Sequence, residues 1–192
     1  MKHLISDSQE GFVVEWPILD NIIIVQEAIH SSLEIKQQGM AIKLDMANAF
    51  DRVNHFFLFE IMSRLGFSKR FIRWTKACII SPWIATLING RPSKFFQASR
   101  GLRKGFPLSP FLFLLVVESL SRKLQYLQEN GKLKGLKISK GDKAATHAQF
   151  ADDTILHGGD STKTAKIFNE VLSSFLKASD GKVNHIKSKV YG

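Results

Sequence analysis

The stretch HAQFADDTILHGG, from His147 to Gly159, places two carboxylates side by side between two short apolar runs. The flanking runs are typical of paired strands, which puts Asp152 and Asp153 at the turn of a hairpin. With 17 Asp and Glu among 192 residues, about one adjacent acidic pair is expected by chance. The pair alone therefore fits an ordinary hairpin tip as well as an active site, and the rest of the chain has to decide between them.

A third carboxylate, Asp45, ends the apolar run MAIKLDM at residues 40–46, which the pattern predicts to be a strand. If this strand neighbours the hairpin in one sheet, Asp45, Asp152 and Asp153 converge at one edge. Like charges about 4 Å apart repel by roughly 1 to 4 kcal/mol, so such a cluster persists only when it is protonated or bridged by cations. Oxygen ligands without His or Cys favour Mg²⁺, and two such ions can hold the attacking and leaving oxygens of a phosphoryl transfer.

The other patterns mix helices and hairpin strands without a regular βαβ alternation, which predicts an α+β fold with an antiparallel sheet backed by helices. Asn54 and Ser109 are expected to be N-caps, with Pro110 in the first helical turn. A separate hairpin is expected to turn at Asn89-Gly90. The expected helices cover residues 20–39, 54–66, 68–80, 109–130 and 161–178, and the expected sheet strands cover 40–46, 136–139, 144–150, 154–158 and 182–187.

The chain is basic, with 27 Lys and Arg against 17 Asp and Glu and a net charge of +10. This balance favours a polyanionic partner, nucleic acid first and an anionic membrane second, although a solvated basic face is the plainer alternative. Basic and aromatic residues alternate at 68–76 and 91–105. Such alternation is typical of surfaces that grip phosphates and stack bases.

Several classes of protein are excluded by composition. The single cysteine, Cys78, rules out an internal disulfide framework and a cysteine-rich zinc site. The N-terminal residues become polar too early for a signal peptide, and the longest apolar run, at 111–117, is too short to span a bilayer. These features predict an intracellular protein of the nucleus or cytoplasm, neither secreted nor bound to a membrane.

Four segments together resemble the successive palm motifs of reverse transcriptases, especially those of plant-type non-LTR (LINE-type) retrotransposons. They are AIKLDMANAFDRVNH at 41–55, RGLRKGFPLSPFLF at 100–113, FADDTILH at 150–157 and SDGKVNHIKSK at 179–189. Residues 4–23 are similar to the segment that precedes the first of these motifs in that family. The resemblance covers nearly the whole chain, with the motifs in the family's order.

The resemblance implies a polymerase palm with a ferredoxin-like core and part of the fingers. It also implies RNA-directed DNA synthesis, with an RNA template, a DNA primer and deoxynucleoside triphosphates as partners. By position, Asp45, Asp152 and Asp153 would hold two Mg²⁺ ions, or Mn²⁺ in their place, with Asp153 as the weaker ligand.

The remaining motif residues take roles around the nucleotide by the same resemblance. Phe50 would pack under the sugar and exclude a 2′-hydroxyl, and Lys187 would protonate the leaving pyrophosphate or contact phosphates. The glycine loop would lie over the nucleotide and template, with Gly101, Gly105 and Pro107 shaping it and Lys104 beside the incoming nucleotide.

The resemblance also implies a division of the chain. Residues 1–39 and about 54–100 would be partial fingers and connecting segments, and residues 40–53 and 100–192 would be palm. On this interpretation the chain is a single-domain fragment without a thumb, an endonuclease or an RNase H.

Three departures from the family pattern keep other interpretations open. Lys104 stands where the family usually has Gln, Phe106 where its plant branch has Asp, and Glu15-Trp16 where it has Gly-Arg. The main alternative is therefore a catalytically inactive, basic nucleic-acid-binding remnant. A translated fragment without function and a metal-dependent nuclease are further alternatives.

Overall fold

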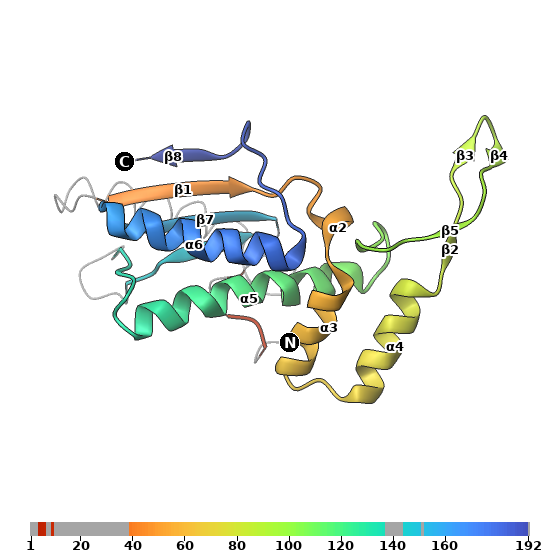
Figure 1. Cartoon of the computed structure of the whole chain (residues 1–192), viewed down its shortest axis with the longest axis horizontal. Helices are drawn as coiled ribbons and strands as arrows, with labels where there is room; N and C mark the ends of the chain where they lie inside the picture. The colour runs from red at the N-terminus through yellow and green to blue at the C-terminus, as the bar shows by residue number, and fades with distance from the viewer. Residues whose placement is uncertain (1–3, 7–8, 10–38, 137–143, 151, 192) are drawn as a thin grey trace.

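The computed structural model describes residues 4–6, 9, 39–136, 144–150 and 152–191, and all statements below concern these residues (Figure 1). The helix expected at 20–39, except for Gly39, and most of the strand expected at 136–139 lie outside them. Leu136 itself pairs with Ala145 in an isolated antiparallel bridge. The remaining elements mix helices with antiparallel strands, which confirms the expected α+β class.

The central sheet has four antiparallel strands in the order β6-β7-β1-β8. They are β1 (Gly39–Asp45), β6 (His147–Phe150), β7 (Asp153–Gly159) and β8 (Lys189–Tyr191). The hairpin predicted around the acidic pair is confirmed as β6 and β7, and β7 pairs along its whole length with β1. The strand that ends at Asp45 is therefore the neighbour of the hairpin that carries the acidic pair.

The final strand was predicted in the wrong place, at 182–187. Residues after Val183 instead form a turn, in which the carbonyl of Asn184 accepts hydrogen bonds from the N–H groups of Lys187 and Ser188. The side-chain oxygen of Asn184 also accepts from the N–H of Ile186 at 3.2 Å. Asparagine competes with strand pairing by capturing nearby backbone groups in this way, so β8 begins only at Lys189.

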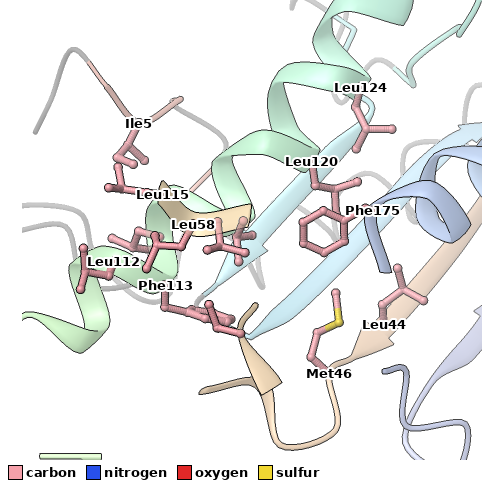
Figure 2. Close-up of a cluster of buried hydrophobic side chains, with 14 of the residues drawn as sticks. Ile5, Leu44, Met46, Leu58, Leu112, Phe113, Leu115, Leu120, Leu124 and Phe175 are labelled. Atoms are coloured by element: carbon pink, nitrogen blue, oxygen red, sulfur yellow. The ribbon is translucent and has the colours of Figure 1, made fainter. Parts of the chain in front are cut away.

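Two long helices, α5 (Ser109–Glu129) and α6 (Thr162–Ser179), lie on one face of the sheet (Figure 1). Alternate residues of β1 and β7 point toward them, among them Leu44 and Leu156, which belong to the hydrophobic core. Figure 2 shows Leu120 of α5, Phe175 of α6 and the strand residue Leu44 within one cluster of buried side chains. Each such side chain contributes about 1.5–3 kcal/mol when it is fully buried, so burial against the helices fixes which face of the sheet stays open.

The helix starts follow the sequence closely, with one exception. Helix α3 (His55–Arg64) begins after Asn54, whose side chain accepts a hydrogen bond from the Phe57 N–H, and α4 (Lys69–Ile80) begins after Ser68 in the same way. Ser109 was wrongly predicted to be an N-cap, because that position belongs to Leu108. The Ser109 hydroxyl donates instead to the carbonyl of Arg103 at 2.7 Å and closes the preceding loop. None of the helices in the described ranges is long and apolar enough to cross a bilayer.

A second hairpin follows α4 and extends away from the sheet (Figure 1). Its two short ladders pair β2 (Trp83–Ile84) with β5 (Phe96–Gln97) and β3 (Leu87–Ile88) with β4 (Arg91–Pro92). The turn lies at Asn89 and Gly90, as predicted, and both residues have positive φ, 49° and 77°. This is the backbone that a two-residue hairpin turn requires.

Two buried histidines predict an acid-sensitive stability. Burial lowers the pKa of His147 to about 3, with a further contribution from His157, and lowers the pKa of His157 itself to about 4, which the Ala145 backbone partly opposes. Both values lie below the ordinary 6.5, so the unfolded chain binds more protons in acid and the folded state loses stability as the pH falls. Between pH 7 and pH 5 we expect a loss of about 2 kcal/mol per histidine.

Urea unfolding at pH 7 and pH 5 measures this loss. The variant His157→Gln removes one titrating group, so its unfolding free energy should change less between the two pH values than that of the wild type. The exposed His185 supplies the control, and His185→Gln should keep the wild-type pH dependence. An identical pH response in the wild type and His157→Gln would contradict the assignment.

Candidate active site

The pairing of β1 with β7 brings two carboxylates together. Asp45 is the register partner of Asp153 at the last position of the ladder. Directly opposite residues of an antiparallel pair share a face and have Cβ atoms about 4.5–5.5 Å apart. Because Leu44 points into the core, Asp45 and Asp153 point to the opposite face, away from α5 and α6.

The third acid lies beside this pair at the mouth of a cleft. Asp152 is exposed in the turn that immediately precedes β7. An open cleft of about 760 Å³ is lined by Asp45 and Asp152 together with Phe50, Lys104 and Lys187. These five residues come from the four separate motif segments, and in the structure they line one cleft.

Phe50 forms part of the cleft wall and is held there by packing. Its ring stacks on Phe113 of α5, with 4.7 Å between ring centroids. Phe50 belongs to the short helix α2 (Ala49–Arg52). This helix starts after Asn48, whose backbone is left-handed with φ 51°. The sharp turn after β1 therefore carries Phe50 back over the end of the sheet beside Asp45.

The glycine loop is fixed to the chain around Phe50. The Leu102 N–H donates to the Phe50 carbonyl at 2.7 Å, and the Gly101 N–H donates to the Val53 carbonyl at 2.8 Å. Gly101 has φ 88°, and a Cβ placed there would lie 2.6 Å from the Asp51 carbonyl oxygen. Only glycine allows this close approach of the two backbones.

The tip of the loop contributes unevenly to the cleft. Lys104 lines it and forms an ion pair with Asp51, with 3.0 Å between Nζ and Oδ2. Gly105 and Pro107, which the resemblance also placed at the nucleotide, are exposed and do not line the cleft. Gly105 has φ 80°, as its place in the turn requires, and the position that a Cβ would take there is open.

Lys187 is carried to the acids by a turn that is tied to Asp45. The Asn184 N–H donates to the Asp45 carbonyl at 2.9 Å, and the Asp45 N–H donates to the Ser188 hydroxyl at 3.2 Å. The turn between Asn184 and Ser188 therefore replaces a strand partner at the end of β1. Its side chain Lys187 is close enough to act on the charge of Asp153.

Three basic residues of the site, Lys43, Arg52 and Lys182, were not among the residues predicted from the sequence. Lys43 lies two residues before Asp45 on the same face of β1, and its Nζ is 4.0 Å from the Asp153 Oδ1. The period of two in a strand is the signal that could have identified it. Arg52 and Lys182 line the cleft, so its wall is more basic than the predicted site residues indicated.

The electrostatics of Asp153 reflect this crowding. Partial burial raises the pKa of Asp153 above its ordinary value. Lys43 opposes the rise, the neighbouring charges of Asp152 and Asp45 add to it, and Lys187 opposes it again. The acids therefore repel one another, and a bound cation would relieve that repulsion.

The carboxylates of the site suit a hard divalent cation that also keeps water or phosphate oxygens as ligands. Among the described residues, no three His, Cys, Asp or Glu side chains stand together as a ready-made metal cluster. Asp45 and Asp152 nevertheless line the open cleft, Asp153 is the register partner of Asp45, and all three offer only carboxylate oxygens. Mg²⁺ is typically held in this way, by one or two carboxylates together with water and phosphate oxygens.

Comparison with known proteins connects this site to a family. The sequence profile of the family described as "Reverse transcriptase (RNA-dependent DNA polymerase)" matches residues 2–192. A Pol polyprotein from the retrotransposable element R2DM of Drosophila melanogaster is 30% identical over 77% of this chain, which spans 13% of that protein. The Xenopus laevis transposon TX1 149 kDa protein is 28% identical over 89% of the chain, again across 13% of its own length.

A plant protein and two solved structures extend the comparison. An uncharacterized mitochondrial protein of Arabidopsis thaliana is 44% identical over 38% of the chain, which matches 59% of its length. The structure of apo telomerase from Candida tropicalis superposes on 96% of the chain with a TM-score of 0.66 and 17% identity, across 33% of the telomerase chain. Telomerase from Candida albicans gives a TM-score of 0.65 over 89% of the chain, at 13% identity.

Proposed function

Because the chain belongs to the reverse transcriptase (RNA-dependent DNA polymerase) family, we propose that its cleft carries out RNA-directed DNA synthesis. The fold is the α+β polymerase palm, as the superposition on telomerase shows. The observation that carries the proposal is the register pairing of Asp45 with Asp153, with Asp152 beside them in a cleft lined by basic side chains.

The acids would hold the metal ions of the reaction. The family in general uses divalent metal ions, and we assign two Mg²⁺, replaceable by Mn²⁺, to Asp45, Asp152 and Asp153, with Asp153 the weaker ligand. When bound, the ions would activate the primer 3′-hydroxyl and neutralise charge on the triphosphate. In the transfer, the 3′-hydroxyl releases its proton to solvent and its oxygen bonds to the α-phosphorus of a deoxynucleotide, as the bond to the β-phosphate oxygen breaks and pyrophosphate leaves.

Basic residues of the cleft would bind and orient the triphosphate. Lys104, Lys182 and Lys187 line it together with Arg52. Lys187 is carried toward the acids by the turn that is hydrogen-bonded to Asp45, and it would contact the leaving phosphates or give them a proton. Gly105 and Pro107 would act at a distance from the cleft, by shaping the loop that carries Lys104 over the template.

The proposed function would divide the elements between a palm and part of the fingers. The sheet, α2, α5, α6 and the glycine loop would form the palm, from residues 40–53 and 100–191. The segment of about 54–100, with α3, α4 and the second hairpin, would supply part of the fingers or a connection to them.

Phe50 should determine which sugar the cleft accepts. Its ring lies in the cleft wall against Phe113, where it would meet a 2′-hydroxyl. We expect Phe50→Val to raise ribonucleotide incorporation relative to deoxynucleotide incorporation by about 10- to 100-fold, because a steric exclusion of this size is worth about 1–3 kcal/mol. Parallel incorporation rates with the two nucleotides measure the ratio, and an unchanged ratio would remove Phe50 from this role.

An extension assay distinguishes the proposal from its alternatives. The wild-type chain is incubated with a labelled DNA primer on an RNA template, deoxynucleotides and Mg²⁺, with and without a chelator. Metal-dependent lengthening of the primer is the expected result. Shortening would indicate a nuclease, and tight binding without any change in length would indicate an inactive remnant.

The inactive alternative has one structural observation in its favour. Two lysines of the site are already paired with acids, Lys104 with Asp51 at 3.0 Å and Lys43 with Asp153 at 4.0 Å. Metal and nucleotide binding would have to break the second contact. Both pairs are substantially exposed, and such pairs are worth only about 0–1 kcal/mol, so they are weak obstacles to activity.

A further inference from the structure

Lys43 belongs to one of two like-charged pairs that lie next to each other on the face of the sheet directed away from α5 and α6. Strand β1 pairs with β7 on one side, where Asp45 lies opposite Asp153. It pairs with β8 on the other side, where Lys43 lies opposite Lys189. Directly opposite residues of an antiparallel pair share a face, and like charges there destabilise the pair. Each pair therefore needs an opposite charge close by.

Lys43 supplies that opposite charge to one of the acids. Its Nζ is 4.0 Å from the Asp153 Oδ1. Between described residues, no other ion pair includes any of the three acids of the site. Burial raises the pKa of Asp153, and Lys43 is the neighbouring charge that opposes this rise most strongly, ahead of Lys187. Lys43 is therefore the main countercharge of this carboxylate.

The contact also directs the Asp153 carboxylate. Asp45 and Asp152 line the cleft of about 760 Å³, whereas neither Asp153 nor Lys43 does. The Asp153 oxygen instead lies near a lysine that precedes Asp45 by two residues on β1, toward the middle of the sheet. A cation that enters the cleft would reach Asp45 and Asp152 first, and would gain Asp153 only when this carboxylate leaves Lys43.

We propose that Lys43 is a positioning residue, which holds the Asp153 carboxylate beside the cleft and competes with a divalent cation for it. The inference rests on the proposed function, because it concerns the metal ions assigned to the same acids. An ammonium group and a metal ion repel each other when both approach one carboxylate. This competition would account for Asp153 as the weaker metal ligand. Removal of the lysine charge should therefore tighten metal binding, and the gain should depend on Asp153.

The test is the binding of Mn²⁺ alone to the whole chain at fixed ionic strength, with the free ion measured by electron paramagnetic resonance. Lys43→Gln is expected to bind Mn²⁺ about three- to tenfold more tightly than the wild type. A single charge about 5 Å from a divalent ion has an effect of that order in water at about 0.15 M salt. Lys43→Arg retains the charge and should keep the wild-type affinity.

Two further comparisons separate the contact with Asp153 from the charge of the lysine. Lys189→Gln removes an equal charge from the same face of the sheet, but one strand further from Asp153. It should change the Mn²⁺ affinity by less than about twofold, because salt screens charges at that range. In an Asp153→Asn background, Lys43→Gln should also change the affinity by less than about twofold, because the carboxylate that Lys43 positions is no longer present.

Three results would contradict the inference. Equal affinity of Lys43→Gln and a wild type that binds Mn²⁺ would remove Lys43 from this role and leave the metal assignment standing. An equal gain with and without Asp153 would show that Lys43 acts only through its long-range field. A folded wild type that binds no Mn²⁺ would contradict the metal assignment and this inference together. A chain with the predicted order of affinities that never extends a primer would support the inference and contradict the proposed function.

Discussion

Replacement of Asp153 by Asn is expected to stabilise the fold and to abolish DNA synthesis. Burial, together with the charges of Asp152 and Asp45, raises the pKa of Asp153. A carboxyl group with a raised pKa in the folded state is destabilising at pH 7, because its ionised form is disfavoured there relative to the unfolded chain. Asparagine has nearly the same shape without the charge, so the free energy of unfolding at pH 7 should rise.

The same substitution should remove a ligand of the proposed metal ions. Metal ions at such a site contribute several kcal/mol to the transition state, so we expect the incorporation rate to fall by about 10³-fold or more. Urea unfolding and primer extension on one preparation measure the two effects. Asp160→Asn, an exposed acid outside the cleft, is the matched control and should change neither. A destabilised Asp153→Asn protein would contradict the electrostatic account, and one that still extends the primer would contradict the catalytic account.

Replacement of Gly101 by Ala is expected to give the largest loss of stability among single changes near the site. The new Cβ would lie 2.6 Å from the Asp51 carbonyl oxygen, at a residue with φ 88°. A left-handed non-glycine residue costs about 1–2 kcal/mol and overpacking adds about 1–3 kcal/mol. We expect the total to reach about 3–5 kcal/mol, which is about 10 °C in Tm for a chain of this size.

The Gly101→Ala change should also reduce activity in the protein that remains folded. The loop is hydrogen-bonded to Phe50 through Leu102, so a displaced loop moves the cleft wall beside Asp45. Gly105→Ala is the matched control, because Gly105 has a similar φ of 80° but no atom within 4 Å of the new Cβ. It should lose only about 1 kcal/mol. Equal losses in the two variants would show that backbone conformation alone, and not the contact with Asp51, decides the effect.

Helix starts and turns could be predicted where a short local sequence pattern determines the backbone conformation. Asn54 caps its helix as predicted, the helices expected to begin at Ser68 and Ser161 do begin there with those serines as N-caps, and Asn89-Gly90 forms the hairpin turn. In each case a short side chain accepts a hydrogen bond from a nearby backbone N–H group, or a glycine adopts the positive φ that the turn requires. The prediction for Ser109 was wrong because its hydroxyl donates a hydrogen bond to the carbonyl of Arg103 instead of capping the helix. No local sequence pattern reveals that contact.

The site was predictable in its residues but not in its geometry. Asp45, Asp152 and Asp153 were identified from the sequence, but their juxtaposition depends on the β1–β7 register, which is a contact between distant segments. The place of Lys187 depends on hydrogen bonds that join the 184–188 turn to Asp45, and there the sequence predicted a strand. Lys43 was missed because the resemblance gives it no role, although it lies within the first motif segment, and only the pairing of its strand shows that it faces Asp153.

The most direct test of the central claim is the incorporation of a single deoxynucleotide, under single-turnover conditions with Mg²⁺, onto a DNA primer annealed to an RNA template. The claim is that Asp45, Asp152 and Asp153 form the centre for nucleotidyl transfer. The wild type and the Asp160→Asn control should both add one nucleotide, whereas Asp45→Asn and Asp152→Asn should add none in the same time. Incorporation by either of these two variants at the wild-type rate would contradict the claim, as would a folded wild-type chain that binds the primer and template and adds nothing.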